Sequence, residues 1–319
     1  MTFFRKDEQL EVFGNQILEA TWAEFPDLGR NQIALTWIVY DPPVFVNTGG
    51  ALSPLAFWNH EVRGFNYRGG DRIYPASIVK LFYLVAVYEW LETGMIQSTA
   101  ELERAMRDMI IDSSNDATSL VVDVLTGTTS GPELSHGPFQ TWQLQRNIVN
   151  RYFHSLGWSE LEIINVNQKT WCDGPYGRER VFLGELMENR NMLTTNATAR
   201  LLHSIVGGVA VSSKGSQTMM GLIKRSLLNQ AELNPDEENQ VTGFLGAGLP
   251  PDAQLWSKAG WTSQVRHDAA YIEIPGKRPY LLVVFTEGKA NSKNKAILPF
   301  ISQRIAASIE DIESSDPVP

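Results

Sequence analysis

The chain has 319 residues, of which 43% are hydrophobic and 20% are charged. This length and composition predict one large or two ordinary globular domains, and they exclude a disordered chain, a collagen-like repeat and a coiled-coil rod. The formal net charge of −9 makes a nucleic-acid backbone or an anionic membrane surface an unfavourable partner. The longest apolar run, Leu81–Val87, is far shorter than the roughly 20 residues that span a bilayer.

A single cysteine, Cys172, excludes an internal disulfide framework and a cysteine-based zinc cluster, and we interpret it as a bystander. The histidines are scattered, and no glycine-rich phosphate loop precedes a helix, so we expect neither a metal nor a cofactor. No apolar region typical of a secretion signal follows Met1–Glu8. We therefore expect a cytoplasmic protein, or a mature periplasmic or secreted form whose leader has been removed.

The first part of the chain alternates helix and strand patterns. Apolar residues at helical spacing predict an amphipathic helix over Glu8–Phe25. Residues Gln32–Tyr40 alternate with the period of a half-buried strand, and a second strand is predicted over Val62–Tyr67. Proline and glycine residues between them predict an irregular surface segment over residues 41–59.

The middle of the chain is predicted to be helical. Residues Ser77–Thr93 are apolar on nearly every side, which is typical of a helix at the centre of a domain. Residues 128–145 are rich in Gly, Ser and Pro and predict a long loop. Further helices are expected over Glu101–Asp112, Asp116–Leu125, Ile148–Leu156, Ala197–Val206 and Thr218–Leu228.

Strand patterns return near the end of the chain. They cover Leu255–Thr262, Ala269–Ile274 and Tyr280–Thr286, and a closing amphipathic helix contains Ile301 and Ile305. Tight turns between these strands predict antiparallel pairing.

This order of elements predicts an α/β (α+β) fold. An antiparallel sheet is built from both ends of the chain with flanking helices, and an all-helical domain is inserted between them. We expect residues 1–74 and 212–319 to form the sheet domain and residues 75–211 to form the helical domain. The active site is expected in the cleft between the two.

The most informative segment is Tyr74–Lys80. Ser77 falls in the first turn of the buried helix, and Lys80 follows three residues later on the same face. A serine at a helix N-terminus has free backbone N–H groups beside it, and a partly desolvated lysine can accept its proton. Such a serine is more often only a helix cap. Lys80 favours a catalytic role, because a charge in so apolar a helix needs a partner or a purpose.

Two further clusters could carry chemistry. Ser113 and Asn115 stand at a helix–helix junction, a pattern that alone indicates a turn and a cap. Lys258 and Gly260 stand on a predicted strand, where the glycine would let a ligand approach the backbone closely. Each cluster alone is weak evidence, and their order along the chain is what makes them informative.

A Ser-x-x-Lys that opens a buried helix, a Ser-x-Asn in a helical block and a Lys-x-Gly on a late strand occur in the order of the penicillin-recognising serine hydrolases. The sequence therefore resembles the class A β-lactamases and the similar penicillin-binding proteins over roughly Gln32–Ala307. The resemblance includes the Thr194-Thr195 pair and the segment Arg266–Ala270.

This resemblance implies a role for each matching residue. Ser77 would be the nucleophile that forms the acyl-enzyme, and Lys80 would accept its proton. Ser113 would pass a proton to the leaving nitrogen, and Asn115 would bind the substrate amide and position Lys80. Lys258 would line the opposite wall and attract a substrate carboxylate.

The late strand would complete the site. The backbone N–H groups of Ser77 and Trp261 would form the oxyanion hole, and Gly260 and Thr262 would contact the substrate. Ala259 departs from the family, which usually has a Thr or Ser there whose hydroxyl meets the substrate carboxylate. Thr262 and two neighbouring residues, Ser263 and Arg266, are the candidates for replacing that hydroxyl.

Deacylation is the clearest departure from the family. Class A β-lactamases activate a water with a Glu, helped by an Asn four residues later, in a loop before the Thr-Thr helix. Counting back from that helix reaches Glu179, but Leu183 stands where the Asn belongs. Counting forward from Gly157 reaches Asn167 instead. Glu179 is thus either the deacylation base or a solvated carboxylate.

The sequence predicts a serine hydrolase that forms an acyl-enzyme with β-lactams and hydrolyses it slowly. One alternative is a D-alanyl-D-alanine carboxypeptidase, or a related amidase or esterase, on the same fold. Another is an inactive binding protein that keeps the fold, and the complete set of motif residues argues against it. The expected partner is a small molecule, a β-lactam or a D-Ala peptide, with no nucleic acid and no transmembrane segment.

Overall fold

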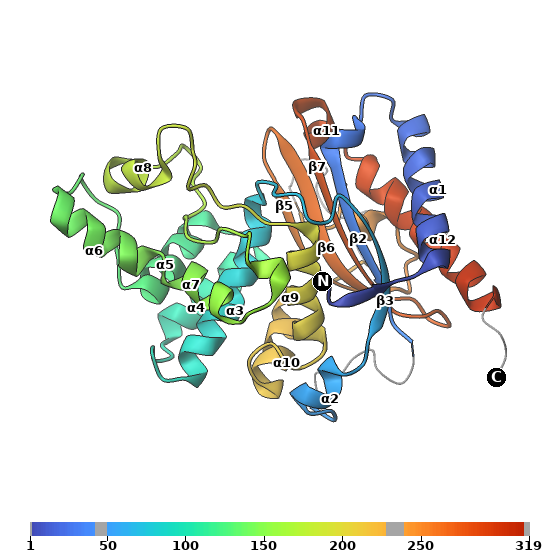
Figure 1. Ribbon diagram of the computed structural model, residues 1–319, viewed down its shortest axis with the longest axis horizontal. Coiled ribbons are helices and arrows are strands. Elements are labelled where there is room, and N and C mark those ends of the chain that lie inside the picture. The colour runs from blue at the N-terminus through green and yellow to red at the C-terminus, as the bar shows by residue number, and fades with distance from the viewer. Residues whose placement is uncertain (1, 42–49, 228–238, 316–319) are drawn as a thin grey trace.

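The computed structural model describes residues 2–41, 50–227 and 239–315 of the chain (Figure 1). In these ranges, no helix has the length and apolar character needed to cross a membrane. The described helices are α1 (Glu8–Glu24), α2 (Pro54–Trp58), α3 (Val79–Glu92), α4 (Ala100–Ile111), α5 (Asn115–Thr126), α6 (His136–Arg146), α7 (Ile148–Ser155), α8 (Gly177–Leu183), α9 (Thr195–Val206), α10 (Ser213–Ile223), α11 (Lys289–Lys293) and α12 (Ile297–Ser315).

A seven-stranded sheet contains strands from both ends of the chain, as predicted, in the order β1-β3-β2-β7-β6-β5-β4. Its members are β1 (Phe4–Lys6), β2 (Ile33–Val39), β3 (Val62–Tyr67), β4 (Lys224–Arg225), β5 (Gln254–Trp261), β6 (Val265–Glu273) and β7 (Tyr280–Glu287). The pairs are antiparallel except at one edge, where β1 and β3 run parallel. The expectation of a wholly antiparallel sheet is wrong there, because α1 and β2 give the chain enough length to return in the same direction.

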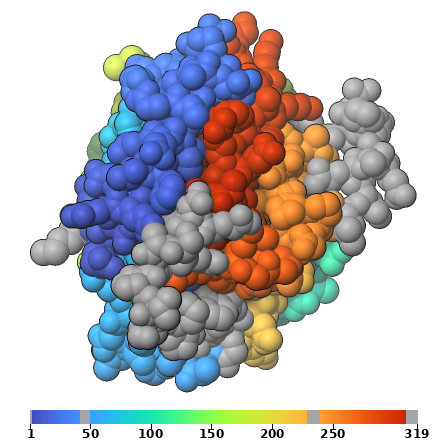
Figure 2. Space-filling view, turned by 90° about the vertical axis from the view of Figure 1, so that its right-hand side faces the viewer, coloured from blue at the N-terminus to red at the C-terminus, as the bar shows by residue number. Residues whose placement is uncertain are grey.

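Alternate side chains of the sheet pack on its two faces. On one face, residues such as Leu35 and Leu282 share a buried cluster with residues of α1 and α12. On the other face, residues such as Ile38 and Leu281 join a cluster that continues through α3, α4, α5, α7 and α9. Figure 1 shows α1 and α12 on the side of the sheet away from the helical part, and Figure 2 shows these two helices (dark blue and red) side by side. This continuous packing fixes β5 against the helices that carry the motif residues.

Two sequence predictions need correction. The prediction of a loop over residues 128–145 is wrong in its second half, because α6 forms there. Pro138 is tolerated in this helix because it stands in the first turn, where the backbone N–H groups have no partner within the helix. The helix predicted over Thr218–Leu228 begins earlier, where the Ser212 side chain caps α10, and it ends at Ile223, before β4; Leu228 lies outside the described residues.

The segment predicted to be irregular, residues 41–59, contains the short helix α2, and its residues 42–49 lie outside the described part. The division of the chain at residues 74 and 212 stays a prediction.

Candidate active site

Ser77 lies in a short 3-10 turn, Ala76–Ile78, that leads directly into α3. Ala76 has a φ of 46°, in the left-handed region that a residue with a side chain adopts only at a free-energy cost. Strained backbone of this kind is concentrated at functional sites, where the surrounding structure holds it in place. The turn leaves Ser77 half-buried at the start of an apolar helix.

Lys80 is completely buried on the first turn of α3. Its Nζ donates to Asn115 Oδ1 at 2.8 Å, to Ser113 Oγ at 3.3 Å and to the Ser113 carbonyl. None of its contacts within the described residues is a carboxylate. Burial lowers the pKa of Lys80 to about 7, against a smaller opposing effect of the Cys172 charge. At neutral pH a substantial fraction of this amine is therefore unprotonated and able to accept a proton.

Ser113 joins the helical part to the sheet. Its Oγ accepts from Lys258 Nζ on β5 at 3.0 Å as well as from Lys80. Ser113 also has a positive φ, 56°, so both serines of the motifs stand at or beside strained backbone. Lys258 is completely buried, and burial, followed by the nearby charges of Lys80 and Arg225, lowers its pKa well below the usual value. A hydrogen-bonded chain thus runs from Lys80 through Ser113 to Lys258.

Asn115 begins α5 and faces both Lys80 and the loop that contains Cys172. Its Nδ2 donates to Cys172 Sγ at 3.3 Å, and Cys172 is exposed. This contact could not be predicted from the sequence, because the two residues are far apart in the chain and Cys172 belongs to no motif. The thiol that the sequence analysis interprets as a bystander therefore lies beside a predicted catalytic residue.

Gly260 lies against the turn that carries Ser77. A Cβ atom at Gly260 would lie 3.0 Å from the Ser77 backbone nitrogen and 2.9 Å from the Pro75 carbonyl oxygen. Glycine is therefore required here by the chain's own backbone, whereas the sequence suggested the approach of a ligand. This contact brings the end of β5, with Trp261, to the Ser77 turn, as the predicted oxyanion hole requires.

The residues around Ala259 differ in their accessibility. Ala259 is completely buried, in the cluster that includes residues of α12. Thr262 and Ser263 line a cavity of about 410 Å³ together with Tyr74, Gln168 and Cys172, among others. Arg266 is buried, and its guanidinium donates to the Ser292 carbonyl at 2.9 Å. Of the residues considered to replace the missing hydroxyl, Thr262 and Ser263 have access to this cavity.

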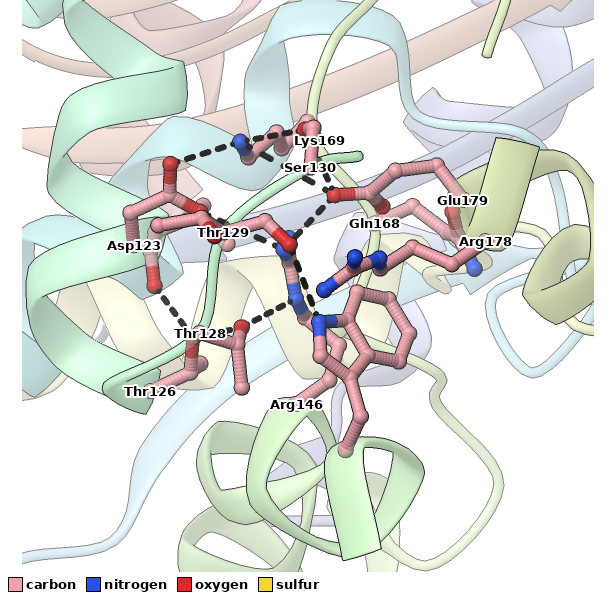
Figure 3. Close-up of polar contacts among 12 residues, drawn as sticks. Asp123, Thr126, Thr128, Thr129, Ser130, Arg146, Gln168, Lys169, Arg178 and Glu179 are labelled. Atoms are coloured by element: carbon pink, nitrogen blue, oxygen red, sulfur yellow. Dashed lines mark hydrogen bonds and ion pairs between the residues drawn. The ribbon is translucent and has the colours of Figure 1, made fainter. Parts of the chain in front are cut away.

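Glu179 is completely buried, so its interpretation as a solvated carboxylate is wrong. Its Oε1 accepts from Arg146 at 2.6 Å and from Ser130 at 2.9 Å, and Lys169 Nζ lies at 3.8 Å (Figure 3). None of its hydrogen bonds or ion pairs in the described part of the chain reaches Ser77. Oε1 of this carboxylate compensates buried positive charge, whereas Oε2 is buried without a hydrogen-bond partner among the described residues.

Asn167, the alternative position for the deacylation base in the sequence analysis, is held in a network of hydrogen-bonded carboxamides. Its Nδ2 donates to Asn165 Oδ1 at 3.0 Å and to Asn189 Oδ1 at 2.9 Å. The adjacent Gln168 is buried and lines the cavity beside Cys172. Its side-chain amide has no hydrogen-bond partner in the part of the chain that the structure describes. No sequence signal marks Gln168, because its position depends on the path of a long loop.

The fold and the order of the motif residues agree with the resemblance to the β-lactamases and penicillin-binding proteins. A family model described as the beta-lactamase enzyme family matches residues 97–309, more than half of the chain, and the chain belongs to this family. A search of curated proteins gave no match.

Solved structures show the same fold at low sequence identity. A β-lactamase from Sphaerobacter thermophilus is 18% identical with a TM-score of 0.61, over 93% of this chain and 97% of that one. PBP-A is 17% identical with a TM-score of 0.63, over 97% of this chain and 98% of that one. A PBP-A mutant, solved as an acyl-enzyme complex with penicillin G, has a TM-score of 0.65 at 17% identity, over 96% of this chain and 98% of that one.

Proposed function

We propose that the protein is a serine acyl-transfer hydrolase that opens β-lactams through Ser77, in a cleft between the sheet and the helical residues 75–211. The observation that carries the proposal is the hydrogen-bonded chain Lys80–Ser113–Lys258. The half-buried Ser77 precedes Lys80 by three residues and directly follows the strained Ala76. A protein that only binds a ligand has no need of a buried, partly unprotonated lysine beside a serine.

Acylation would use each of these groups in turn. Ser77 Oγ attacks the β-lactam carbonyl carbon while its proton passes to the Lys80 amine. The oxygen of the tetrahedral intermediate is held by the backbone N–H groups of Ser77 and Trp261. The carbon–nitrogen bond then breaks, and the ring nitrogen takes a proton from Ser113 Oγ, which regains one from the lysine amines. Asn115 Nδ2 would exchange its contact with Cys172 for the substrate amide.

Deacylation should be slow. It needs a base that activates a water, and general-base catalysis is typically worth about 10²–10⁴-fold in rate. Glu179 is engaged by Arg146, and no carboxylate contacts Lys80 among the described residues. We therefore expect a long-lived acyl-enzyme. The same observation favours a second candidate, a D-alanyl-D-alanine carboxypeptidase or related amidase or esterase.

Intact-mass spectrometry of the protein mixed with penicillin G, followed over time, tests the proposal. We expect the mass of one penicillin to be added rapidly and lost slowly, and no addition with Ser77→Ala or Lys80→Ala. Circular dichroism of both variants checks that the fold is retained. Addition to Ser77→Ala, or no addition to the wild-type protein, would refute the assignment. Release of D-alanine from a D-Ala-D-Ala peptide would support the second candidate.

A further inference from the structure

Gln240 belongs to no sequence motif, yet it contacts a predicted catalytic lysine. It is 6% exposed, in the segment before the 3-10 turn Leu245–Gly248. Its Oε1 accepts from Lys258 Nζ and, at 3.2 Å, from the Ala259 backbone N–H. Its Nε2 donates to the carbonyls at the end of α4, to Ile110 at 3.0 Å and to Ile111 at 2.7 Å. The carboxamide is therefore held from both of its ends.

The contact with Gln240 completes the hydrogen bonding of Lys258. The amino group of a lysine can donate at most three hydrogen bonds, when it is protonated. Lys258 Nζ has three acceptors: Ser113 Oγ at 3.0 Å, its neighbour's carbonyl, Ala259 O, at 2.8 Å, and Gln240 Oε1. No N–H of Lys258 is left for a substrate carboxylate. Of the three acceptors, the first belongs to the catalytic chain and the second to the backbone, so only Gln240 could be exchanged for a ligand.

The surroundings of Gln240 Oε1 are basic. Arg225 Nη2 lies 3.5 Å away, and the same guanidinium donates to the carbonyls of Ile110 and Ser257. Asp268 is the buried carboxyl group that interacts with both Arg225 and Lys258, and burial raises its pKa to about 7, so it is only partly ionised at neutral pH. An anion at the position of Gln240 Oε1 would be stabilised, but an uncharged carboxamide of the chain itself fills that position.

We propose that Gln240 occupies the N–H of Lys258 that a substrate carboxylate would use, and that it thereby directs Ser77 towards acyl donors without a carboxylate beside Lys258, such as esters and carboxamides. The inference rests on the proposed acylation of Ser77 and adds to it a class of substrate. Ala259 is consistent with this selection, because no hydroxyl is needed to bind a carboxylate that does not enter.

Acylation by penicillin G and by its methyl ester tests the inference, since the two differ in the charge of one group. Rate constants are measured by intact-mass spectrometry on the wild-type chain and on three variants. In the wild-type protein we expect the ester to react at least as fast as the acid. In Gln240→Ala the acylation rate constant of the acid should rise about tenfold or more relative to that of the ester, because a hydrogen bond from Lys258 to the charged carboxylate becomes possible. In Gln240→Glu the ratio should move the opposite way, because the new carboxylate repels the substrate's.

Gln303→Ala, on the exposed side of α12, is the matched control and should leave the ratio unchanged. Opposite shifts in two variants of one position cannot arise from a loss of folded protein, which lowers both rates together. A wild-type protein that prefers the acid by tenfold or more, or a ratio that Gln240→Ala does not change, would overturn the inference while leaving the proposed function intact. No adduct with either compound in any form of the protein would refute the proposed function, and the inference with it.

Discussion

The substitution Glu179→Gln separates a structural carboxylate from a catalytic one. Glu179 and Arg146 are both completely buried, with 2.6 Å between Oε1 and Nη2. Removing one charge of such a pair leaves the other buried without compensation, which typically costs about 3–5 kcal/mol. Asp123, only 23% exposed, remains on Arg146 at 3.2 Å, so the lower end of this range is expected. We predict a loss of about 3 kcal/mol in the free energy of unfolding.

Urea denaturation measures this loss, and the decay of the penicillin adduct in intact-mass spectra measures deacylation. We expect the decay rate per folded molecule to be unchanged. Glu185→Gln is the matched control, because Glu185 lies in the same part of the chain but is exposed, so neither quantity should change. The double variant Glu179→Gln/Arg146→Met should recover much of the lost stability, since it removes both charges of the pair.

The opposite result would refute this reasoning. An unchanged free energy of unfolding, together with a decay slowed by about 10²-fold or more, is the signature of a lost general base. Glu179 would then be the deacylation residue, and the protein an efficient β-lactamase.

Three further predictions concern the site. The rate of acylation should increase as pH rises through about 7 and then level off, because the unprotonated form of Lys80 is the proposed base and burial lowers its pKa to about 7. A rate that is constant from about pH 6 to about pH 8 would exclude that role. Alkylation of Cys172 with N-ethylmaleimide should slow penicillin labelling, because its Sγ lies 3.3 Å from Asn115 Nδ2. Labelling of the Cys172→Ser variant should be insensitive to the reagent, and equal labelling rates of treated and untreated wild-type protein would contradict the prediction. Ala259→Thr should lower the free energy of unfolding by about 1–3 kcal/mol, because a larger side chain enters a completely buried position; a more stable variant in urea denaturation would show free space there.

Periodic elements could be predicted from the sequence because their signal is local. The strand Val62–Tyr67 has the predicted bounds, and α4 and α7 agree with prediction to within a residue or two at each end. The motif residues were also identified in advance, because their order along the chain is typical of a known family. Their hydrogen bonds bring Lys80, Ser113, Asn115 and Lys258 together.

Positions set by loops could not be predicted in this way. Glu179 is surrounded by charged residues in sequence, Arg178 and Arg180, which suggested an exposed surface. Its burial depends on Arg146, the last residue of α6, and this helix overlaps the segment 128–145 that was predicted to be a loop. The ion pair forms only when α6 and α8 approach each other. Gln240 likewise reaches Lys258 from a segment without periodicity.

The lack of a carboxylate in contact with Lys80, among the described residues, bears on both acylation and deacylation in the proposed reaction. A carboxylate in contact with Lys80 would favour its charged form and raise its pKa. The contacts of Lys80 in the described residues are instead a carboxamide, a hydroxyl and backbone carbonyls, which compensate burial poorly and leave the amine partly unprotonated at neutral pH. The same lack of a carboxylate that would let Lys80 accept the Ser77 proton would leave, among the described residues in contact with Lys80, no second base for the water that releases the acyl group. The proposed fast acylation and slow deacylation would therefore have a common electrostatic cause.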